Sequence, residues 1–140
     1  MKSIGVVVDA SVALAWVLQD EESAYADRVL RYVAEADASI HVPSLWLLEI
    51  GNALLAAERR GRLLRADVER AAALLTSLPI AMHSLEARNL PRLMDLARSY
   101  HLSVYDSTYL ALSIDQGLPL ATLDDQLRRA AADSGVDYRG

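Results

Sequence analysis

The sequence lacks several features that would narrow its function directly. It contains no cysteine, which excludes disulfides and zinc sites built from thiolates. Charged residues interrupt every apolar run before it reaches the length of a membrane-spanning helix, so no membrane partner is expected. Residues 1–8 run directly into Asp9 without a cleavage site of small residues, so no signal peptide is expected. Together these absences favour a cytoplasmic protein.

Lysine is almost absent: of 14 cationic residues, only Lys2 is a lysine. The net charge of −5 argues against a protein held to nucleic acid by bulk positive charge. Arginines nevertheless gather in two clusters, which are Arg59, Arg60, Arg62 and Arg65, and then Arg128 and Arg129. A planar guanidinium can bind two phosphate oxygens at once, so both clusters are candidate phosphate contacts. Solvated helix ends explain them equally well.

Several common catalytic motifs are missing as well. The histidines, His41, His83 and His101, are scattered, and none has the HExxH spacing of a zinc protease. The nucleophile elbow GxSxG, the Walker loop and the dinucleotide motif GxGxxG are also absent. We therefore interpret the histidines as ordinary, and expect Trp16, Trp46 and the tyrosines to pack in the core or at a subunit interface.

What the chain does contain is enough apolar sequence for one domain spanning residues 1–140. Apolar residues make up 53% of it and charged residues 24%. Short apolar runs alternate with helical patterns, which predicts a three-layer α/β/α sandwich with a mostly parallel sheet of four or five strands. Strands are expected at 4–8, 40–42, 79–82 and 118–121, with a possible short fifth at 136–138. Helices are expected at 11–18, 24–36, 44–60, 66–77, 89–100, 105–116 and 124–132, with a loop at 19–23.

Local signals predict where several of these helices begin and end. Ser44 is expected to cap the long third helix, and Gly61 to end it. Pro91 cannot lie inside a straight helix without cost, so it is placed in the first turn of its helix. Gly117 is expected to end the helix that begins near Tyr105.

Four acidic residues stand out because each lies inside or beside an apolar run. Asp9 ends the first strand and Asp124 follows the fourth, so both should lie at one edge of the sheet, where Asp106 and Glu49 can flank them from helices. An ionised carboxylate among apolar neighbours is costly unless a cation compensates it, and no lysine or arginine adjoins Asp9, Glu49 or Asp106. Clustered carboxylates therefore predict an all-oxygen site for Mg²⁺ or Mn²⁺.

Each acid also has a structural explanation of its own. Asp9, Asp106 and Asp124 can cap the helices that follow them. Glu49 lies on a helix that is apolar in nearly every direction, but its long side chain can reach water at a rim. Asp125 adjoins Asp124, and a helix there would direct only one of the two towards a common pocket.

Three polar residues accompany the acids. Ser11 follows Asp9 and can cap the next helix or position a metal-bound water. Asn52 lies three residues after Glu49 on the same side of its helix, where it can hydrogen-bond a ligand or the carboxylate. Thr122 precedes Asp124 and could simply start the last helix.

Four segments occur in a fixed order along the chain: VVDASVALAW at 7–16, PSLWLLEIGNAL at 43–54, YDSTYLAL at 105–112 and LATLD at 120–124. Together they resemble the PIN-domain family, and more narrowly the VapC toxins of type II toxin–antitoxin pairs. The similarity covers essentially the whole chain. It implies a PIN-like parallel sheet flanked by helices, and a ribonuclease that depends on Mg²⁺ or Mn²⁺.

The resemblance also implies roles for particular residues and partners. The acidic pocket of the family corresponds to Asp9, Glu49, Asp106 and Asp124, with Asp9 and Asp106 as its most direct metal ligands and Asp124 favoured over Asp125 by motif register. Supporting polar positions correspond to Ser11, Asn52 and Thr122. The family implies an RNA substrate, a homodimer, and a small VapB-like antitoxin whose tail covers the active site. The alternative is a PIN-like module that binds RNA or an antitoxin without cleaving.

Overall fold

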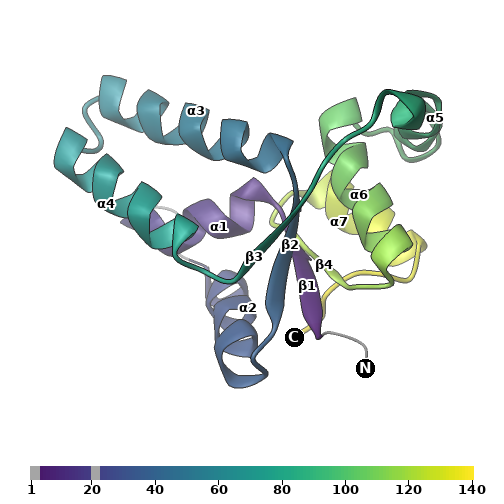
Figure 1. Cartoon of the computed structure of the whole chain (residues 1–140), viewed down its shortest axis with the longest axis horizontal. Helices are drawn as coiled ribbons and strands as arrows, with labels where there is room; N and C mark the ends of the chain where they lie inside the picture. Colours follow the sequence, from purple (N-terminus) through teal and green to yellow (C-terminus); the bar gives the residue numbers. More distant parts are fainter. Residues whose placement is uncertain (1–3, 20–22) are drawn as a thin grey trace.

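A parallel sheet of four short strands forms the centre of the fold, as Figure 1 shows for the described part of the chain. The structure is a computed structural model that describes residues 4–19 and 23–140. The strands are β1 (Gly5–Val8), β2 (Ser39–Pro43), β3 (Ile80–His83) and β4 (Leu120–Ala121), in the order β3-β2-β1-β4. The predicted strands are therefore confirmed, although β3 is shifted by one residue and β4 is shorter than expected.

Helices cover both faces of this sheet. Figure 1 shows α1 to α4 on one side of the strands and α5 to α7 on the other, which confirms the predicted three-layer arrangement. The helices are α1 (Ala10–Val17), α2 (Ala24–Glu35), α3 (Leu45–Arg59), α4 (Arg65–Thr76), α5 (Leu90–Tyr100), α6 (Val104–Gln116) and α7 (Asp125–Asp133). A short 3₁₀ turn, Ala87–Asn89, precedes α5. None of the helices in the described ranges is long and apolar enough to cross a membrane.

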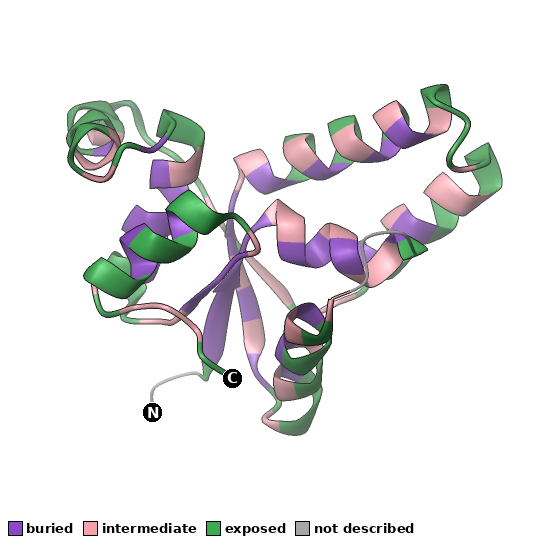
Figure 2. Cartoon of the chain, turned by 180° about the vertical axis from the view of Figure 1, so that it is seen from behind, coloured by how far each residue is buried: buried purple, intermediate pink, exposed green. Residues whose placement is uncertain are grey.

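The core follows from the burial of β1 and α6. Every residue of β1 is buried, as its run of valines predicts for a strand covered on both faces. Residues 107–113 of α6 are all buried, so the middle of this helix is enclosed by the rest of the fold. Figure 2 shows buried residues along β1, β2 and β4 and on the inner sides of the helices. Removing this apolar surface from water is the main stabilising contribution to such a fold.

The strand register places two chain segments side by side at the edge where the acids were expected. β1 and β4 are parallel, with Val7 opposite Leu120 and Val8 opposite Ala121. The residues that follow these strands therefore leave the sheet together. Asp9 is the first residue after β1, and Thr122 is the first after β4.

Most of the predicted helix ends are confirmed. Gly61 and Gly117 both have positive φ, at 74° and 65°, a conformation that glycine adopts without steric cost. Pro91 lies in the first turn of α5. Ser44 occupies the N-cap position of α3, as predicted, but its backbone is already helical (φ −59°, ψ −26°) and its side chain makes no capping hydrogen bond.

The end of the chain adds only a minor extension to the sheet. The possible fifth strand at 136–138 is reduced to a parallel bridge between Leu120 and Asp137. Backbone hydrogen bonds join Leu120 to Val136 and to Tyr138, so this segment still follows β4. The predicted loop at 19–23 lies partly outside the described residues, at positions 20–22.

Candidate active site

Asp9 is a buried acid whose carboxylate is held from two chain segments. It is 6% exposed and forms the N-cap of α1. Its Oδ1 accepts hydrogen bonds from the Ser11 hydroxyl at 2.6 Å and from the Val12 N–H at 3.2 Å. Its Oδ2 accepts one from the Thr122 hydroxyl at 2.5 Å. Asp9 thus caps α1 and is also bonded to the segment that follows β4. Ser11 orients Asp9 and does not cap the helix.

The negative charge of Asp9 is poorly compensated despite these donors, because the carboxylate is buried. Burial raises the pKa of Asp9 from 3.8 to about 6, the three donors oppose the rise, and the charge of Asp106 adds to it. Desolvation disfavours an ionised carboxylate, and a second carboxylate nearby does so further. A cation bound near Asp9 would relieve both effects.

The charge of Asp106 interacts with the charges of the other three acids. It lies in the first turn of α6, where Ser103 is the N-cap and accepts a hydrogen bond from the Asp106 N–H at 3.0 Å. Burial and then the charge of Asp124 raise the pKa of Asp106. The charge of Asp106 in turn adds to the raised pKa values of Asp9 and Glu49. The charges of the four predicted acids therefore interact through Asp106, and we refer to Asp9, Glu49, Asp106 and Asp124 together as the acidic pocket.

Glu49 reaches this pocket from α3 with the help of a tyrosine. Its carboxylate is half-buried and accepts a hydrogen bond through Oε1 from the Tyr109 hydroxyl. Burial raises the pKa of Glu49, the Tyr109 bond lowers it, and the charge of Asp106 raises it again. Burial and the bond to Glu49 raise the pKa of the Tyr109 phenol far above its usual value, so Tyr109 remains a donor.

Asp124 lies at the start of α7, two residues after Thr122 in the sequence. Its Oδ1 accepts a hydrogen bond from the Leu127 N–H at 2.8 Å and caps α7. Its own N–H donates to the Thr122 hydroxyl at 3.0 Å. Asp124 and Asp125 are both exposed, but it is the charge of Asp124 that acts on Asp106. This coupling favours Asp124 over Asp125 as the fourth acid.

The donor set suits a hard divalent cation. Within residues 4–19 and 23–140, no group of three or more His, Cys, Asp or Glu side chains is arranged to hold a metal ion. Mg²⁺ does not require three such ligands, because it usually keeps several waters and binds one or two carboxylates. All four acids offer oxygen ligands. The burial of Asp9, Glu49 and Asp106 and the repulsion between the acids give a cation something to neutralise.

Comparison with known proteins identifies the family. The sequence model described as PIN domain matches residues 6–133. The chain belongs to the PIN-domain family. Ribonuclease VapC3 from Pyrobaculum aerophilum is 36% identical to it over 126 residues, which cover 86% of this chain and 90% of that protein.

Solved structures confirm the PIN-like fold. PAE2754 from Pyrobaculum aerophilum superposes with a TM-score of 0.70 at 22% identity, covering 93% of this chain and 83% of that one. VapC20 from Mycobacterium tuberculosis, a toxin that cleaves the sarcin–ricin loop, superposes with a TM-score of 0.61 at 19% identity, covering 90% and 95%.

The supporting residues of this PIN domain divide into those that reach the acids and one that does not. Ser11 and Thr122 both hold Asp9, as described above. Asn52 lies on the exposed side of α3, and no hydrogen bond from its side chain to Glu49 is found in the described part of the chain. Its supporting role stays a prediction.

Tyr109 was missed by sequence reasoning, which placed the tyrosines in the core or at an interface. It is indeed buried, but its hydroxyl contacts Glu49. The available signal was its spacing, because Tyr109 lies three residues after Asp106 and therefore on the same face of α6. That spacing alone did not indicate contact with a residue on another helix.

The two arginine clusters differ in their relation to the acids. Arg128 donates to the Thr122 carbonyl at 3.1 Å, and its guanidinium lies 5.1 Å from the Tyr25 ring centroid. A positive charge therefore lies next to Thr122, the residue that bonds Asp9. In the first cluster, Arg65 forms an exposed ion pair with Glu69, as expected of a solvated helix end.

Two histidines interpreted as unrelated lie together on the sheet. His41 Nδ1 and His83 Nε2 are 2.8 Å apart, within hydrogen-bond distance, and the two rings stack. Burial and the neighbouring His83 lower the pKa of His41. The pair joins β2 to β3. The two histidines lie 42 positions apart, so a spacing rule within one helix or strand could not predict their contact.

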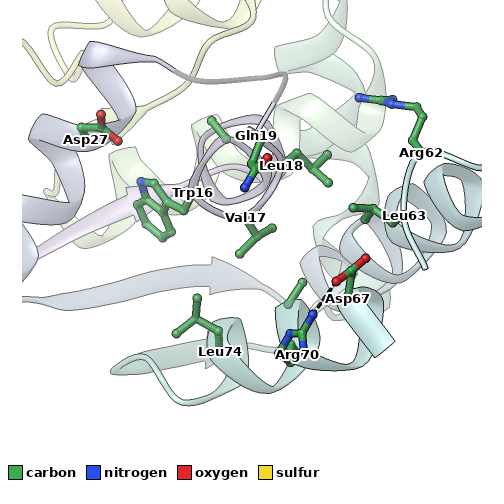
Figure 3. Close-up of a pocket in the computed structure, with 12 residues that line it drawn as sticks. Trp16, Val17, Leu18, Gln19, Asp27, Arg62, Leu63, Asp67, Arg70 and Leu74 are labelled. Carbon is green, nitrogen blue, oxygen red and sulfur yellow. Dashed lines mark hydrogen bonds and ion pairs between the residues drawn. The ribbon is translucent and has the colours of Figure 1, made fainter. Parts of the chain in front are cut away.

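A separate groove lies between α1, α2 and α4. It has a volume of about 970 Å³, and Figure 3 shows its wall at Trp16, Leu63 and Leu74, with an ion pair between Asp67 and Arg70. Among the described residues that line it, none is one of the four pocket acids. The groove is therefore distinct from the acidic site.

Proposed function

We propose that the protein is a metal-dependent endoribonuclease that acts as the toxin of a VapBC-type toxin–antitoxin pair. The observation that carries the proposal is Asp9: a buried acid, clamped by Ser11 and Thr122 at the edge of the sheet, whose pKa is raised by burial and by Asp106. RNA as the substrate is supported by the name of the relative, ribonuclease VapC3, at 36% identity.

Asp9 and Asp106 are proposed as the direct ligands of Mg²⁺ or Mn²⁺, and Glu49 and Asp124 as the acids that complete the site. A bound cation would supply charge neutralisation at the scissile phosphate and a water of lowered pKa. Ser11 and Thr122 keep both oxygens of Asp9 in a fixed orientation.

The protein must also attract an anionic substrate to an acidic site. Arg128 lies close to Thr122 and contributes positive charge there. Arg59 and Arg60 are exposed at the end of α3 and can contact phosphates further along a strand of RNA. Binding that uses several arginines is expected to weaken steeply as the salt concentration rises.

The proposed partners follow from the family and from the surface. A VapB-like antitoxin is proposed as the inhibitor. A homodimer is supported by exposed apolar side chains around α3, α5 and α6, where Leu48 is 70% exposed, Leu90 53% and Tyr105 68%. The protein is proposed to act as one domain over residues 1–140, in the cytoplasm.

Cleavage of labelled RNA tests the activity. Wild-type protein is expected to cleave with Mg²⁺ or Mn²⁺ and to stop with EDTA. Asp9→Asn is expected to lose more than about 100-fold in rate, beyond the loss typical of an outer-sphere partner. Asp124→Asn and Asp125→Asn form a matched pair of neighbouring acids, and only the former should impair cleavage.

The second candidate function is a PIN-like module that binds RNA or an antitoxin without cleaving. The same experiment separates the two. Equal RNA decay with Mg²⁺, with EDTA and with Asp9→Asn would contradict hydrolysis at this site and favour the binding module.

A further inference from the structure

The hydroxyl of Tyr109 contacts the acidic pocket at Glu49. Tyr109 is 1% exposed and lies one helical turn after Asp106 on α6. Its hydroxyl donates to Oε1 of Glu49 on α3. Among the side-chain hydrogen bonds described for residues 4–19 and 23–140, this bond is the one that links α6 to α3. The acid contributed by α3 is thereby tied to the helix that carries Asp106.

Glu49 needs such a tie to stay in the pocket. Its side chain has three rotatable bonds and is only half-buried. Its neighbours Leu48 and Asn52 are exposed, so water is available on that side of α3. The charge of Asp106 repels the carboxylate. A free glutamate in this position would extend towards water, as long charged side chains do.

The direction of the hydrogen bond is fixed by chemistry. An ionised carboxylate can only accept, so the phenol must donate. A phenol is protonated at physiological pH, so the donor persists. One carboxylate oxygen of Glu49 is thus engaged by Tyr109, and the other remains for a hard cation.

We propose that Tyr109 is a positioning residue, which holds the Glu49 carboxylate in the pocket beside Asp106 and so raises the affinity of the site for a divalent cation. This role rests on the proposed function for its consequences in metal binding and catalysis, whereas the position of the Glu49 carboxylate can be tested without it. Tyr109 does not touch the substrate; it acts through Glu49.

Mn²⁺ affinity measured by EPR in the absence of RNA tests the role in the full-length protein. Tyr109→Phe keeps the ring and removes the donor, so it is expected to weaken Mn²⁺ binding by about 10- to 100-fold, as outer-sphere partners of metal ligands do. In a Glu49→Ala background, the same change should have no further effect. Tyr100→Phe, at the end of α5, is the control and should bind Mn²⁺ like the wild type.

Three outcomes would overturn the role of Tyr109. Unchanged Mn²⁺ affinity in Tyr109→Phe is one. An equal loss with and without the Glu49→Ala background is another, since a purely structural tyrosine would behave in that way. The third is a crystal structure of metal-free Tyr109→Phe in which Glu49 keeps its wild-type position.

That crystal structure also separates this role from the proposed function. If wild-type protein neither binds Mn²⁺ nor cleaves RNA, the proposed function fails. The positioning of Glu49 then stands if its carboxylate leaves the pocket in Tyr109→Phe, and falls if it stays. If the wild type does cleave, Tyr109→Phe is expected to lower kcat at saturating RNA more than it raises KM.

Discussion

Asp9 illustrates how one residue serves both the fold and the site. Its Oδ1 caps α1 through the Val12 N–H, and its Oδ2 is held by Thr122 from the neighbouring strand segment. The capping role that an aspartate at this position suggests is real, yet it does not compete with the acidic pocket. A carboxylate has enough lone pairs to satisfy both.

The raised pKa of Asp9 makes metal-free stability depend on pH. Its folded-state pKa of about 6 lies above the ordinary value of 3.8, so the stabilising contribution is complete below about pH 4 and is lost as pH rises through 6. The loss at pH 7 is about 3 kcal/mol, since one pKa unit corresponds to roughly 1.4 kcal/mol.

Asp9→Asn isolates this effect, because the amide resembles the protonated acid. In EDTA, urea unfolding should show the Asp9→Asn variant gaining stability relative to the wild type as pH rises from 3.8 to about 6, the window between the two pKa values. A free-energy difference between the two proteins that stays constant over this range would contradict the raised pKa.

At the scale of elements, the two histidines join β2 to the edge strand β3. Gly5 lies against the ring of His41, while Arg92 and Asp115 line the same small pocket as His83. A β-carbon at Gly5 would come within 2.9 Å of the His41 ring, so this glycine makes room for the pair. The sheet edge therefore contains a hydrogen bond that depends on protonation.

Acid should weaken this strand pair. Because the folded-state pKa of His41 is lowered, its stabilising contribution is present above the ordinary pKa of 6.5 and is lost as pH falls through the folded-state value. His83→Gln keeps a hydrogen-bonding group without the charge. At pH 8 the wild type and the variant should have similar free energies of unfolding. At pH 5.5 the wild type should have the lower free energy of unfolding.

NMR titration of the histidines provides the second measurement. The pKa of His41 is expected to rise in His83→Gln, although burial keeps it below its ordinary value. An unchanged His41 titration would mean that the two rings do not interact in solution.

At the scale of the whole molecule, four carboxylates from separate parts of the chain oppose metal-free folding. Asp106 couples to Asp9, Glu49 and Asp124, so removing its charge relieves repulsion at each of them. The backbone N–H of Asp106 is already capped by Ser103, so replacing its side chain leaves that cap in place.

Asp106→Asn should therefore match or exceed the metal-free wild type in melting temperature. Mg²⁺ should raise the melting temperature of the wild type, because a ligand at about 100 times its Kd stabilises the folded state by roughly 2.7 kcal/mol. It should not raise that of Asp106→Asn, which has lost a proposed ligand of the cation. Differential scanning calorimetry with EDTA and with Mg²⁺ measures both effects. A clearly lower melting temperature of metal-free Asp106→Asn would favour a structural role for this acid.

Local sequence patterns determined the elements and the position of the acids along them. The valines of β1, the glycines at 61 and 117 and Pro91 each restrict the backbone within a few residues, so their effects could be predicted without the fold. The order of strands and helices was sufficient to predict the parallel sheet and to place Asp9 and Asp124 at one edge of it.

Only the tertiary structure decided which side chains meet. Tyr109 contacts Glu49 across 60 positions of sequence, and His41 pairs with His83 across 42. Such contacts depend on the angle at which helices and strands pack, which spacing within one element does not encode. The same holds for Asp124, because the direction of α7 as it leaves β4 brings its charge, and not that of Asp125, to Asp106.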